Sequence, residues 1–299
     1  MPTPQVESVV FDELNCWRIR HGTAQLLVAQ QGAHILSYQV DGQAPLVWFN
    51  DNAIFKQGTP IRGGVPVCWP WFGNLARNPD SVQAMRQSNE PANAHGEARI
   101  LDWELMGIGE DGDALLIDFI LPQAEGQLPG WPHKVGLKLS IRLDQALNIS
   151  LVSYNGGTEA VTLSQALHTY FKVSDVRQVS LQGVDGLRYI ETLENWEARE
   201  QSGDLGFAGE TDRIYLDTPE VLAINDPGLN RRILIQTRGS NSAVVWNPWE
   251  TRAKALPDMA DDGWQGMLCV ETANVMSDVV TLAPDTLHVL SVSLWSEPL

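Results

Sequence analysis

Apolar and polar residues alternate along much of this chain with the period of two that is typical of half-buried β-strands. The clearest alternation covers residues 134–143, and residues 147–152 continue it after a short gap. Comparable alternation or short β-rich runs predict further strands at residues 24–29, 160–169, 231–237, 242–246, 267–275 and 286–295. Helical periodicity is scarce, and we expect only short helical turns near residues 191–199 and 249–256.

Turn-forming residues separate the predicted strands. Glycine, asparagine and aspartate cluster at residues 110–113, 154–157 and 182–186, at spacings typical of sandwiches and barrels. Many strands, few helices and no alternation of strand with helix predict an antiparallel architecture. No low-complexity linker or repeat divides the chain. We therefore expect an all-β fold, one large antiparallel β-sandwich with few short helices, as a single domain over residues 1–299.

One segment does not fit the strand pattern. Residues 74–94 are polar and irregular, and they include Arg77 and Arg86. Loops of this length without structure of their own are usually functional or mobile. The segment also lies directly between two groups of candidate functional residues.

Composition and charge narrow the function. The formal net charge of −17 argues strongly against nucleic acid as a partner, because its phosphates need a basic face. A small anionic ligand is compatible with this charge wherever arginines cluster. No apolar run approaches the length of a membrane span and the N-terminus lacks the regions of a secretory signal, so we expect no membrane association. The three cysteines have no metal-like spacing and fit reduced thiols in the cytoplasm.

Residues 61–73, with the sequence IRGGVPVCWPWFG, form the most unusual segment of the chain. Its adjacent glycines permit close backbone approach, whereas its two prolines fix φ and remove hydrogen-bond donors. Trp71 and Phe72 offer flat apolar surface, and the planar fork of Arg62 suits a phosphate or carboxylate. The segment predicts either a rigid loop that holds an anionic small molecule against aromatic walls or an ordinary buried turn.

Two histidines and two carboxylic acids are candidates for chemistry. His95 follows the irregular loop, and His168 lies in a mainly apolar run where a hydrogen-bonded core histidine is the commoner outcome. Glu271 lies in the apolar run 267–275. Burial there would raise the pKa of the carboxyl group and make it a suitable general base, unless the side chain points outward. Asp212, at a loop-to-strand junction, is equally compatible with capping a turn.

Other chemistries find no support in the sequence. No cluster of His, Cys or Asp has the spacing of metal ligands, so we expect no metal. Neither a Walker loop nor a dinucleotide-binding glycine motif is present. Cys68 lies among aromatic residues with no neighbouring base, so we interpret it as a packed thiol rather than a nucleophile.

Several segments together resemble the aldose 1-epimerase (galactose mutarotase-like) superfamily, and within it the branch of hexose-6-phosphate mutarotases. The segments are residues 60–73, 95–99, 166–171 and 269–271, with 211–215 in support. The resemblance extends over about the whole chain and implies the galactose mutarotase-like supersandwich. It also implies a cytoplasmic isomerase, expected to be a monomer, that interconverts the α and β anomers of a hexose 6-phosphate without a cofactor. Glucose 6-phosphate is the expected substrate.

The same resemblance implies roles for individual residues. Glu271 would be the general base for the C1 hydroxyl, His168 the general acid for the ring oxygen, and His95 would assist at the same place. The implied binding residues are a larger set: Arg62 and Arg99 for the phosphate, Arg86 or Arg77 beside them, Asp212 for sugar hydroxyls, and Trp71 and Phe72 for the apolar face of the sugar.

Glu97 departs from the pattern of this branch, which has an apolar or aromatic residue at that place. A carboxylate there either pairs with Arg99 and competes with phosphate or faces solvent. Two alternatives to the phosphate-specific enzyme therefore stay open. One is a catalytically weak module that binds sugar phosphates, and the other is an epimerase of unphosphorylated aldoses.

Overall fold

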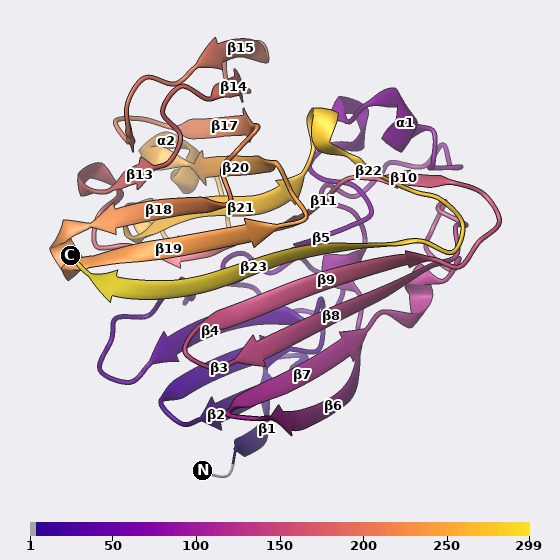
Figure 1. Cartoon of the computed structure of the whole chain (residues 1–299), viewed down its shortest axis with the longest axis horizontal. Helices are drawn as coiled ribbons and strands as arrows, with labels where there is room; N and C mark the ends of the chain where they lie inside the picture. Colours follow the sequence, from indigo (N-terminus) through magenta and orange to yellow (C-terminus); the bar gives the residue numbers. More distant parts are fainter. Residues whose placement is uncertain (1–3) are drawn as a thin grey trace.

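The computed structural model describes residues 4–299, and its strands are antiparallel throughout the sheets (Figure 1). The predicted all-β architecture is confirmed. Only two short α-helices occur in the described residues, α1 (Asp80–Gln83) and α2 (Trp249–Lys254). Short 3-10 turns join the strands: η1 (Leu75–Arg77), η2 (Ala98–Ile100), η3 (Pro122–Ala124), η4 (Val176–Gln178), η5 (Pro227–Leu229), η6 (Gly263–Gly266) and η7 (Met276–Asp278).

A nine-stranded sheet crosses the front of the molecule in Figure 1, with its strands arranged from β18 near the top to β6 near the bottom. Its strand order is β16 (Leu205–Gly206), β13 (Ser180–Gln182), β18 (Val221–Asp226), β19 (Arg231–Arg238), β23 (Leu287–Pro298), β9 (Leu147–Asn155), β8 (Val135–Leu143), β7 (Ala114–Ile120) and β6 (Glu104–Asp111).

An eight-stranded sheet carries the functional cleft described below. Its order is β15 (Glu197–Glu200), β14 (Arg188–Glu191), β17 (Thr211–Leu216), β20 (Ser242–Asn247), β21 (Met267–Asn274), β11 (Gln165–Leu167) and β5 (Val67–Cys68), with β12 (Tyr170–Lys172) also paired to β21. Two smaller sheets complete the fold: β1 (Gln5–Phe11), β2 (Leu14–His21), β3 (Ala24–Ala29) and β4 (His34–Val40) form one, and β10 (Val161–Leu163) and β22 (Val280–Leu282) form the other.

Strands β8 and β9 show how the sequence pattern builds the core. Every second residue of each strand is buried, and the register places Leu139 opposite Leu151. Buried side chains of both strands therefore lie on one face, whereas Ser140 and Ser150 pair on the other, half-exposed face. Each fully buried aliphatic side chain contributes about 1.5–3 kcal/mol by leaving water. The predicted strand at residues 134–143 is confirmed, since β8 differs from it by one residue.

The structure corrects two details of the sequence prediction. The strand predicted over residues 160–169 is divided into β10 and β11, which join different sheets. Ser164 lies at the break, and its Oγ accepts a hydrogen bond from the N–H of Phe72 at 2.8 Å. The helical turn predicted near residues 191–199 is instead the β14–β15 hairpin, whereas the turn predicted near residues 249–256 is confirmed as α2.

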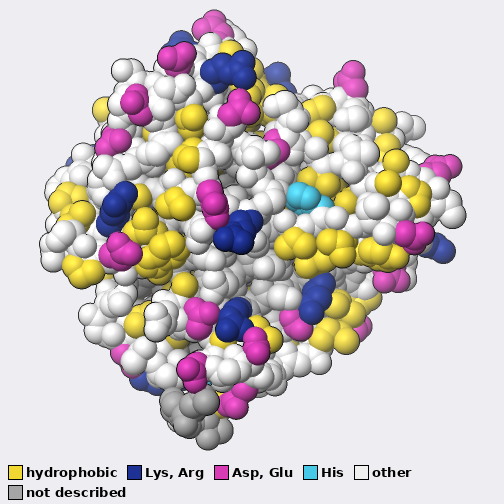
Figure 2. Space-filling model, in the orientation of Figure 1, with side chains coloured by type: hydrophobic (Ala, Val, Ile, Leu, Met, Phe, Trp, Pro, Cys, Tyr) yellow, Lys and Arg dark blue, Asp and Glu magenta, His cyan; other side chains and the backbone are white. Residues whose placement is uncertain are grey.

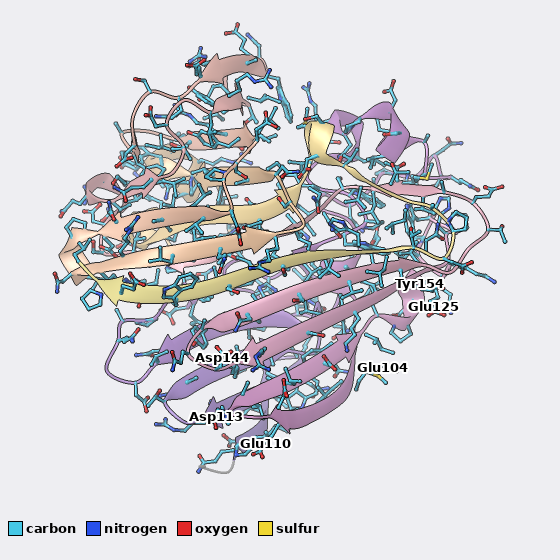
Figure 3. All side chains as sticks on the ribbon, viewed as in Figure 1. Glu104, Glu110, Asp113, Glu125, Asp144 and Tyr154 are labelled. Carbon is cyan, nitrogen blue, oxygen red and sulfur yellow. The ribbon has the colours of Figure 1, made fainter. Side chains whose placement is uncertain are left out.

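The acidic charge of the chain is spread over the exterior. Glu104, Glu110 and Asp113 are exposed along β6 and the adjoining turn (Figure 3), and basic and acidic side chains are interspersed on the face shown in Figure 2. Within residues 4–299 no helix is long and apolar enough to cross a membrane. The same residues contain no group of three or more His, Cys, Asp or Glu side chains arranged to hold a metal ion.

Candidate active site

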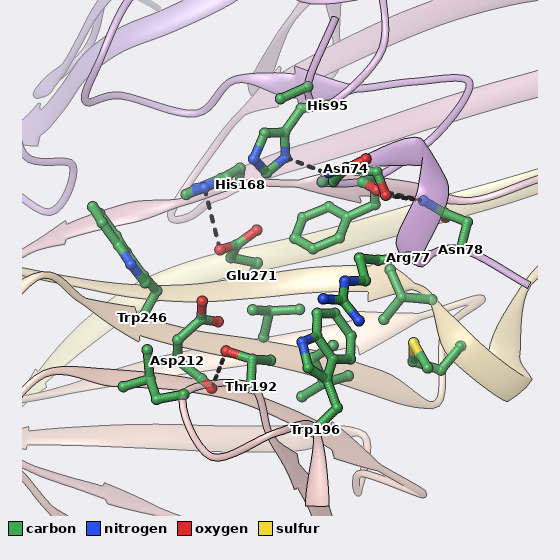
Figure 4. A pocket seen from close by; sticks show the side chains of 18 of the residues that line it. Asn74, Arg77, Asn78, His95, His168, Thr192, Trp196, Asp212, Trp246 and Glu271 are labelled. Atoms are coloured by element: carbon green, nitrogen blue, oxygen red, sulfur yellow. Dashed lines mark hydrogen bonds and ion pairs between the residues drawn. The ribbon is translucent and has the colours of Figure 1, made fainter. Parts of the chain in front are cut away.

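A cleft of about 750 Å³ opens over one face of the eight-stranded sheet (Figure 4). Three neighbouring strands supply its floor. Glu271 of β21 is in register with Val244 of β20, which is in register with Ile214 of β17. Because alternate residues of a strand share a face, Asp212 and Trp246 lie on the same side. All five line the cleft, so the carboxyl groups of Asp212 and Glu271 are held by a sheet rather than by loops.

His168 lies where the pairing to β21 is interrupted. Strand β11 ends at Leu167 and β12 begins at Tyr170, and both pair with β21. In the gap, the N–H of His168 donates to the carbonyl of Pro66 at 3.0 Å instead of to β21. This detour places the imidazole beside Glu271, with Nε2 of His168 3.2 Å from Oε1 of Glu271 (Figure 4). The ring of Tyr170 stacks on the imidazole, with centroids 4.9 Å apart, and fixes its orientation.

Burial sets the protonation of this pair. Glu271 is 1% exposed, and its Oε2 finds no hydrogen-bond partner among the described residues. Burial, reinforced by Asp212, raises the pKa of Glu271 well above its usual value. Burial, reinforced by the charge of Arg99, lowers the pKa of His168 to about 3. Because burial disfavours the charged form of each group on its own, the two groups share one titratable proton. Carboxylic acid with imidazole and carboxylate with imidazolium are its two forms, equal in net charge.

Asp212 is a second carboxyl group in the cleft. Burial raises its pKa to about 6, and the neighbouring Thr192 side chain opposes this shift in part. The hydroxyl of Thr192 donates its hydrogen to the backbone carbonyl of Asp212 at 2.9 Å. Asp212 is therefore ready to accept or donate a hydrogen bond near neutral pH.

His95 borders the cleft next to His168, with the ring centroids 5.5 Å apart. Its φ of 63° lies in the left-handed region, and Gly96 follows with a φ of 72°. A Cβ on Gly96 would lie 2.1 Å from the carbonyl oxygen of Trp69, so only glycine fits there. The N–H of Gly73 donates to Nδ1 of His95 at 3.3 Å. The proton of the neutral ring is therefore on Nε2, which Figure 4 shows on the side toward His168.

The structure corrects the interpretation of Cys68, which does have a neighbouring base. Its Sγ lies 3.3 Å from Nδ1 of His95. Burial raises the pKa of the Cys68 thiol, so the group stays protonated in contact with the imidazole. The thiol supports the orientation of His95, and its protonated state argues against a role as nucleophile.

Arg62 and Arg99 both line the cleft, but they differ in their partners. Nε of Arg62 donates to Oδ1 of Asp258 at 2.8 Å, so this guanidinium already has a carboxylate. Arg99 donates to a backbone carbonyl at 2.7 Å, and no carboxylate within residues 4–299 lies within 4.0 Å of it. Its charge lowers the pKa of both histidines of the cleft, second only to burial. Arg99 is thus a half-buried cation with hydrogen-bonding capacity to spare.

Two of the predicted binding residues lie outside the cleft. Trp71 is 1% exposed, and its indole N–H donates to a backbone carbonyl within the irregular loop at 2.8 Å. Arg86 donates to two backbone carbonyls of the same loop. Consecutive residues of an extended segment point to opposite sides, so Phe72 reaches the cleft where Trp71 does not. The rings of Phe72 and His95 are nearly perpendicular, with centroids 4.8 Å apart. Stacking of Trp71 on a sugar and a phosphate contact from Arg86 are therefore wrong for this structure.

Glu97 does not compete for Arg99. It is 6% exposed and accepts a hydrogen bond from the side chain of Asn93 at 2.9 Å. Within the described part of the chain, no arginine forms an ion pair with it at 4.0 Å or less. The carboxylate that departs from the family pattern is therefore satisfied by an amide and leaves Arg99 without an acidic partner.

The cleft also contains residues that the sequence did not single out. Tyr170 belongs to a segment that carried the family resemblance, so a closer reading could have found it. The sequence around four other cleft residues does not mark them as functional, because each reaches the cleft through strand pairing or chain reversal: Thr192, Trp196, Trp246 and Arg252.

A family model described as aldose 1-epimerase matches residues 15–295. The match covers nearly the whole chain. The chain belongs to the aldose 1-epimerase family. This epimerase is therefore an isomerase that acts on sugars, as the sequence analysis predicted.

Relatives of this epimerase support the assignment. A protein of Escherichia coli K12, named as a candidate glucose-6-phosphate 1-epimerase, is 38% identical over 274 residues, with 91% of this chain and 87% of that protein aligned. A solved structure of a candidate mutarotase from Salmonella typhimurium has a TM-score of 0.87 and 29% identity, covering 98% of this chain and 94% of the other. A galactose mutarotase-like protein from Clostridium acetobutylicum shares the fold, with a TM-score of 0.74 and 15% identity over 99% of both chains.

Proposed function

We propose that this epimerase interconverts the α and β anomers of a hexose 6-phosphate, with glucose 6-phosphate as the expected sugar, and that it needs no cofactor. The observation that carries the proposal is the buried pair of His168 and Glu271, 3.2 Å apart in a cleft that also contains Arg99. Anomer exchange needs one acid and one base acting on neighbouring atoms. The name of the relative from Escherichia coli supports glucose 6-phosphate as the sugar.

In the proposed mechanism, Glu271 accepts the proton of the C1 hydroxyl while His168 donates a proton to the ring oxygen. The bond between C1 and the ring oxygen breaks as the C1 carbonyl forms, which gives the open-chain aldehyde. Rotation about the C1–C2 bond presents the other face of the carbonyl, and the reverse proton transfers close the ring as the other anomer.

The pair is able to make both proton transfers without a change in its net charge. The reaction begins with carboxylate and imidazolium and reaches the aldehyde with carboxylic acid and imidazole. The net charge of His168 and Glu271 is the same in both states, so the step changes no net charge in a buried site, where an uncompensated charge is costly. His95 would assist at the ring oxygen, because its Nδ1 accepts from Gly73 and its Nε2–H stays available as a donor.

We assign the phosphate to Arg99 and Arg62. The phosphate is attached through C6, which lies next to the ring-oxygen side of the sugar, so it belongs on the His168 side of the cleft. Arg99 and Arg62 are the arginines whose charges lower the pKa of His168, which supports their position on that side. A guanidinium binds phosphate through paired hydrogen bonds. Asp212 would bind sugar hydroxyls.

Saturation-transfer NMR of anomer exchange tests the proposed function. Catalytic amounts of the protein are added to glucose 6-phosphate, galactose 6-phosphate and glucose, and the rates are compared with those in buffer. We expect faster exchange, with glucose 6-phosphate turned over more efficiently than glucose. Equal or better turnover of glucose would instead indicate an epimerase of unphosphorylated aldoses. Calorimetric binding of a sugar phosphate with exchange at the buffer rate would indicate a binding module, and either result overturns the proposal.

A further inference from the structure

Arg77 is another arginine of the cleft without a carboxylate partner at 4.0 Å or less within residues 4–299. The carbon at the centre of its guanidinium lies 5.3 Å from the centre of the Trp196 ring. Figure 4 shows both side chains inside the cleft, at the end away from His168. In a chain with a net charge of −17, an arginine that lies on an indole and faces an open cleft has donors free for a ligand.

The turn that carries Arg77 is fixed in place. Arg77 ends η1, and the side chain of Asn74 accepts a hydrogen bond from a backbone N–H within this turn at 3.0 Å. On the other side, Asn78 donates to a backbone carbonyl at 2.8 Å and accepts from the hydroxyl of the buried Ser164. Ser164 lies four residues before His168 in the chain. The position of Arg77 is therefore tied to the segment that carries the proposed acid, which favours a precise contact over a diffuse charge.

Trp196 is held in an unfavourable backbone conformation. Asn195 and Trp196 have φ values of 55° and 63°, and such values are rare for a bulky residue like tryptophan. The indole packs against the apolar cluster under the cleft that includes Ile214 and Val244. Strained residues persist where the surrounding structure holds them, and they are concentrated at ligand sites. The hairpin therefore presents the indole to the cleft as a fixed platform for Arg77.

We propose that Arg77, supported by Trp196, binds the hydroxyls on the C3–C4 edge of the sugar and so contributes to the choice of hexose. The inference rests on the proposed function, because His168 and Glu271 then hold the edge formed by C1 and the ring oxygen. The C3–C4 edge is the opposite side of a six-membered ring and faces the opposite end of the cleft. A guanidinium lying on an indole directs its N–H groups outward in its own plane, where two neighbouring hydroxyls accept them.

The competing role for Arg77 is a phosphate contact. Figure 4 shows the guanidinium of Arg77 beside Trp196, at the end of the cleft away from His168. Arg77 is therefore further from the ring-oxygen side, where C6 and its phosphate belong. This difference assigns Arg77 to ring hydroxyls and leaves the phosphate to the other two arginines.

The test compares Arg77→Ala and Arg77→Lys with wild type on glucose 6-phosphate, its 3-deoxy and 4-deoxy analogues, and glucose. The matched control is Arg232→Ala, since Arg232 on β19 is exposed, lies outside the cleft and also has no carboxylate partner within residues 4–299. We expect Arg77→Ala to lower kcat/KM for glucose 6-phosphate about tenfold to a hundredfold, as for loss of a hydrogen bond from a charged group. Arg77→Lys should restore little, because it keeps the charge without the planar fork.

The decisive result is the deoxy comparison. The loss caused by Arg77→Ala should shrink at least about threefold for one of the deoxy sugars, and it should be similar for glucose and glucose 6-phosphate. Equal losses on every deoxy analogue, a loss confined to phosphorylated sugars, or no loss at all would overturn the inference. If wild type itself does not accelerate exchange, the proposed reaction fails separately, and calorimetric affinities of the same sugars for the same variants then decide the role of Arg77. Thermal melts confirm that each variant is folded.

Discussion

Nε2 of His168 lies 3.2 Å from Oε1 of Glu271, and both side chains are at least nine-tenths buried. The two residues come from segments about a hundred positions apart, and the break between β11 and β12 brings them together. Burial disfavours the charged form of each group, whereas the neutral pair and the ion pair have the same net charge. The relationship therefore couples gain of a proton at one residue to loss of a proton at the other, as ring opening requires.

Glu271→Gln should remove the base while keeping the size of the side chain. We expect the rate of anomer exchange to fall by about 10²–10⁴-fold, the usual contribution of a positioned acid or base. Exchange NMR measures the rate, and circular dichroism checks the fold. Glu210→Gln is the matched control, because Glu210 is an exposed carboxyl that also lines the cleft. Exchange at the wild-type rate in Glu271→Gln would exclude the mechanism.

Arg99→Ala should weaken the use of phosphorylated sugar selectively. The loss of kcat/KM for glucose 6-phosphate should be about tenfold to a hundredfold larger than the loss for glucose, since a charged hydrogen-bond partner of the phosphate is removed. Steady-state exchange NMR with both sugars gives the ratio, and Arg232→Ala should change neither. Similar losses for both sugars would contradict the phosphate assignment.

Asp212→Asn should stabilise the protein at alkaline pH. Burial raises the pKa of Asp212 from 3.8 to about 6, so between these values the folded chain holds a proton that the unfolded chain has released. The free energy of unfolding contributed by this group therefore falls as pH rises from about 4 to about 6. Asparagine removes that penalty. Urea unfolding should show the variant more stable than wild type at pH 8 and the difference shrinking toward pH 4, and a variant less stable at pH 8 would refute the account.

The buried His34 should oppose the stability of the protein in acid. Burial lowers the pKa of His34 from 6.5 to about 4. As pH falls below about 6.5, the unfolded chain binds a proton at His34 that the folded chain does not bind, so the contribution of this residue to the free energy of unfolding decreases toward pH 4. Urea unfolding at pH 7, 6 and 5 measures this slope.

His34→Gln isolates this contribution. His34 is fully buried outside the cleft, and its Nε2 lies 2.8 Å from the carbonyl oxygen of Gly63, a contact that a glutamine amide is able to replace. In this pH range, the slope of the free energy of unfolding against pH should lose the contribution of about one titrating group in the variant. An unchanged slope in His34→Gln would contradict the prediction.

Most of the sheet architecture could be predicted from alternation alone. The pattern at residues 134–143 is a local property of a half-buried strand, and β8 follows it closely. The hairpin at residues 188–200 could not be predicted in this way, because its strand β15 is exposed throughout and has no apolar period. The break at Ser164 was equally invisible, since it depends on hydrogen bonds to Phe72 and Asn78 far away in the chain.

The sequence by itself determined the all-β class, the family and the residue types available for acid–base chemistry, because periodicity and motifs are local. Only the tertiary structure decided which of them meet. In the folded chain, His168 contacts Glu271, and Arg62 forms an ion pair with Asp258 whereas Arg99 has no carboxylate partner within residues 4–299. Trp71 is buried in the core, whereas Phe72 lines the cleft. These outcomes depend on strand register and on where strands are interrupted, and both are set by packing between distant segments.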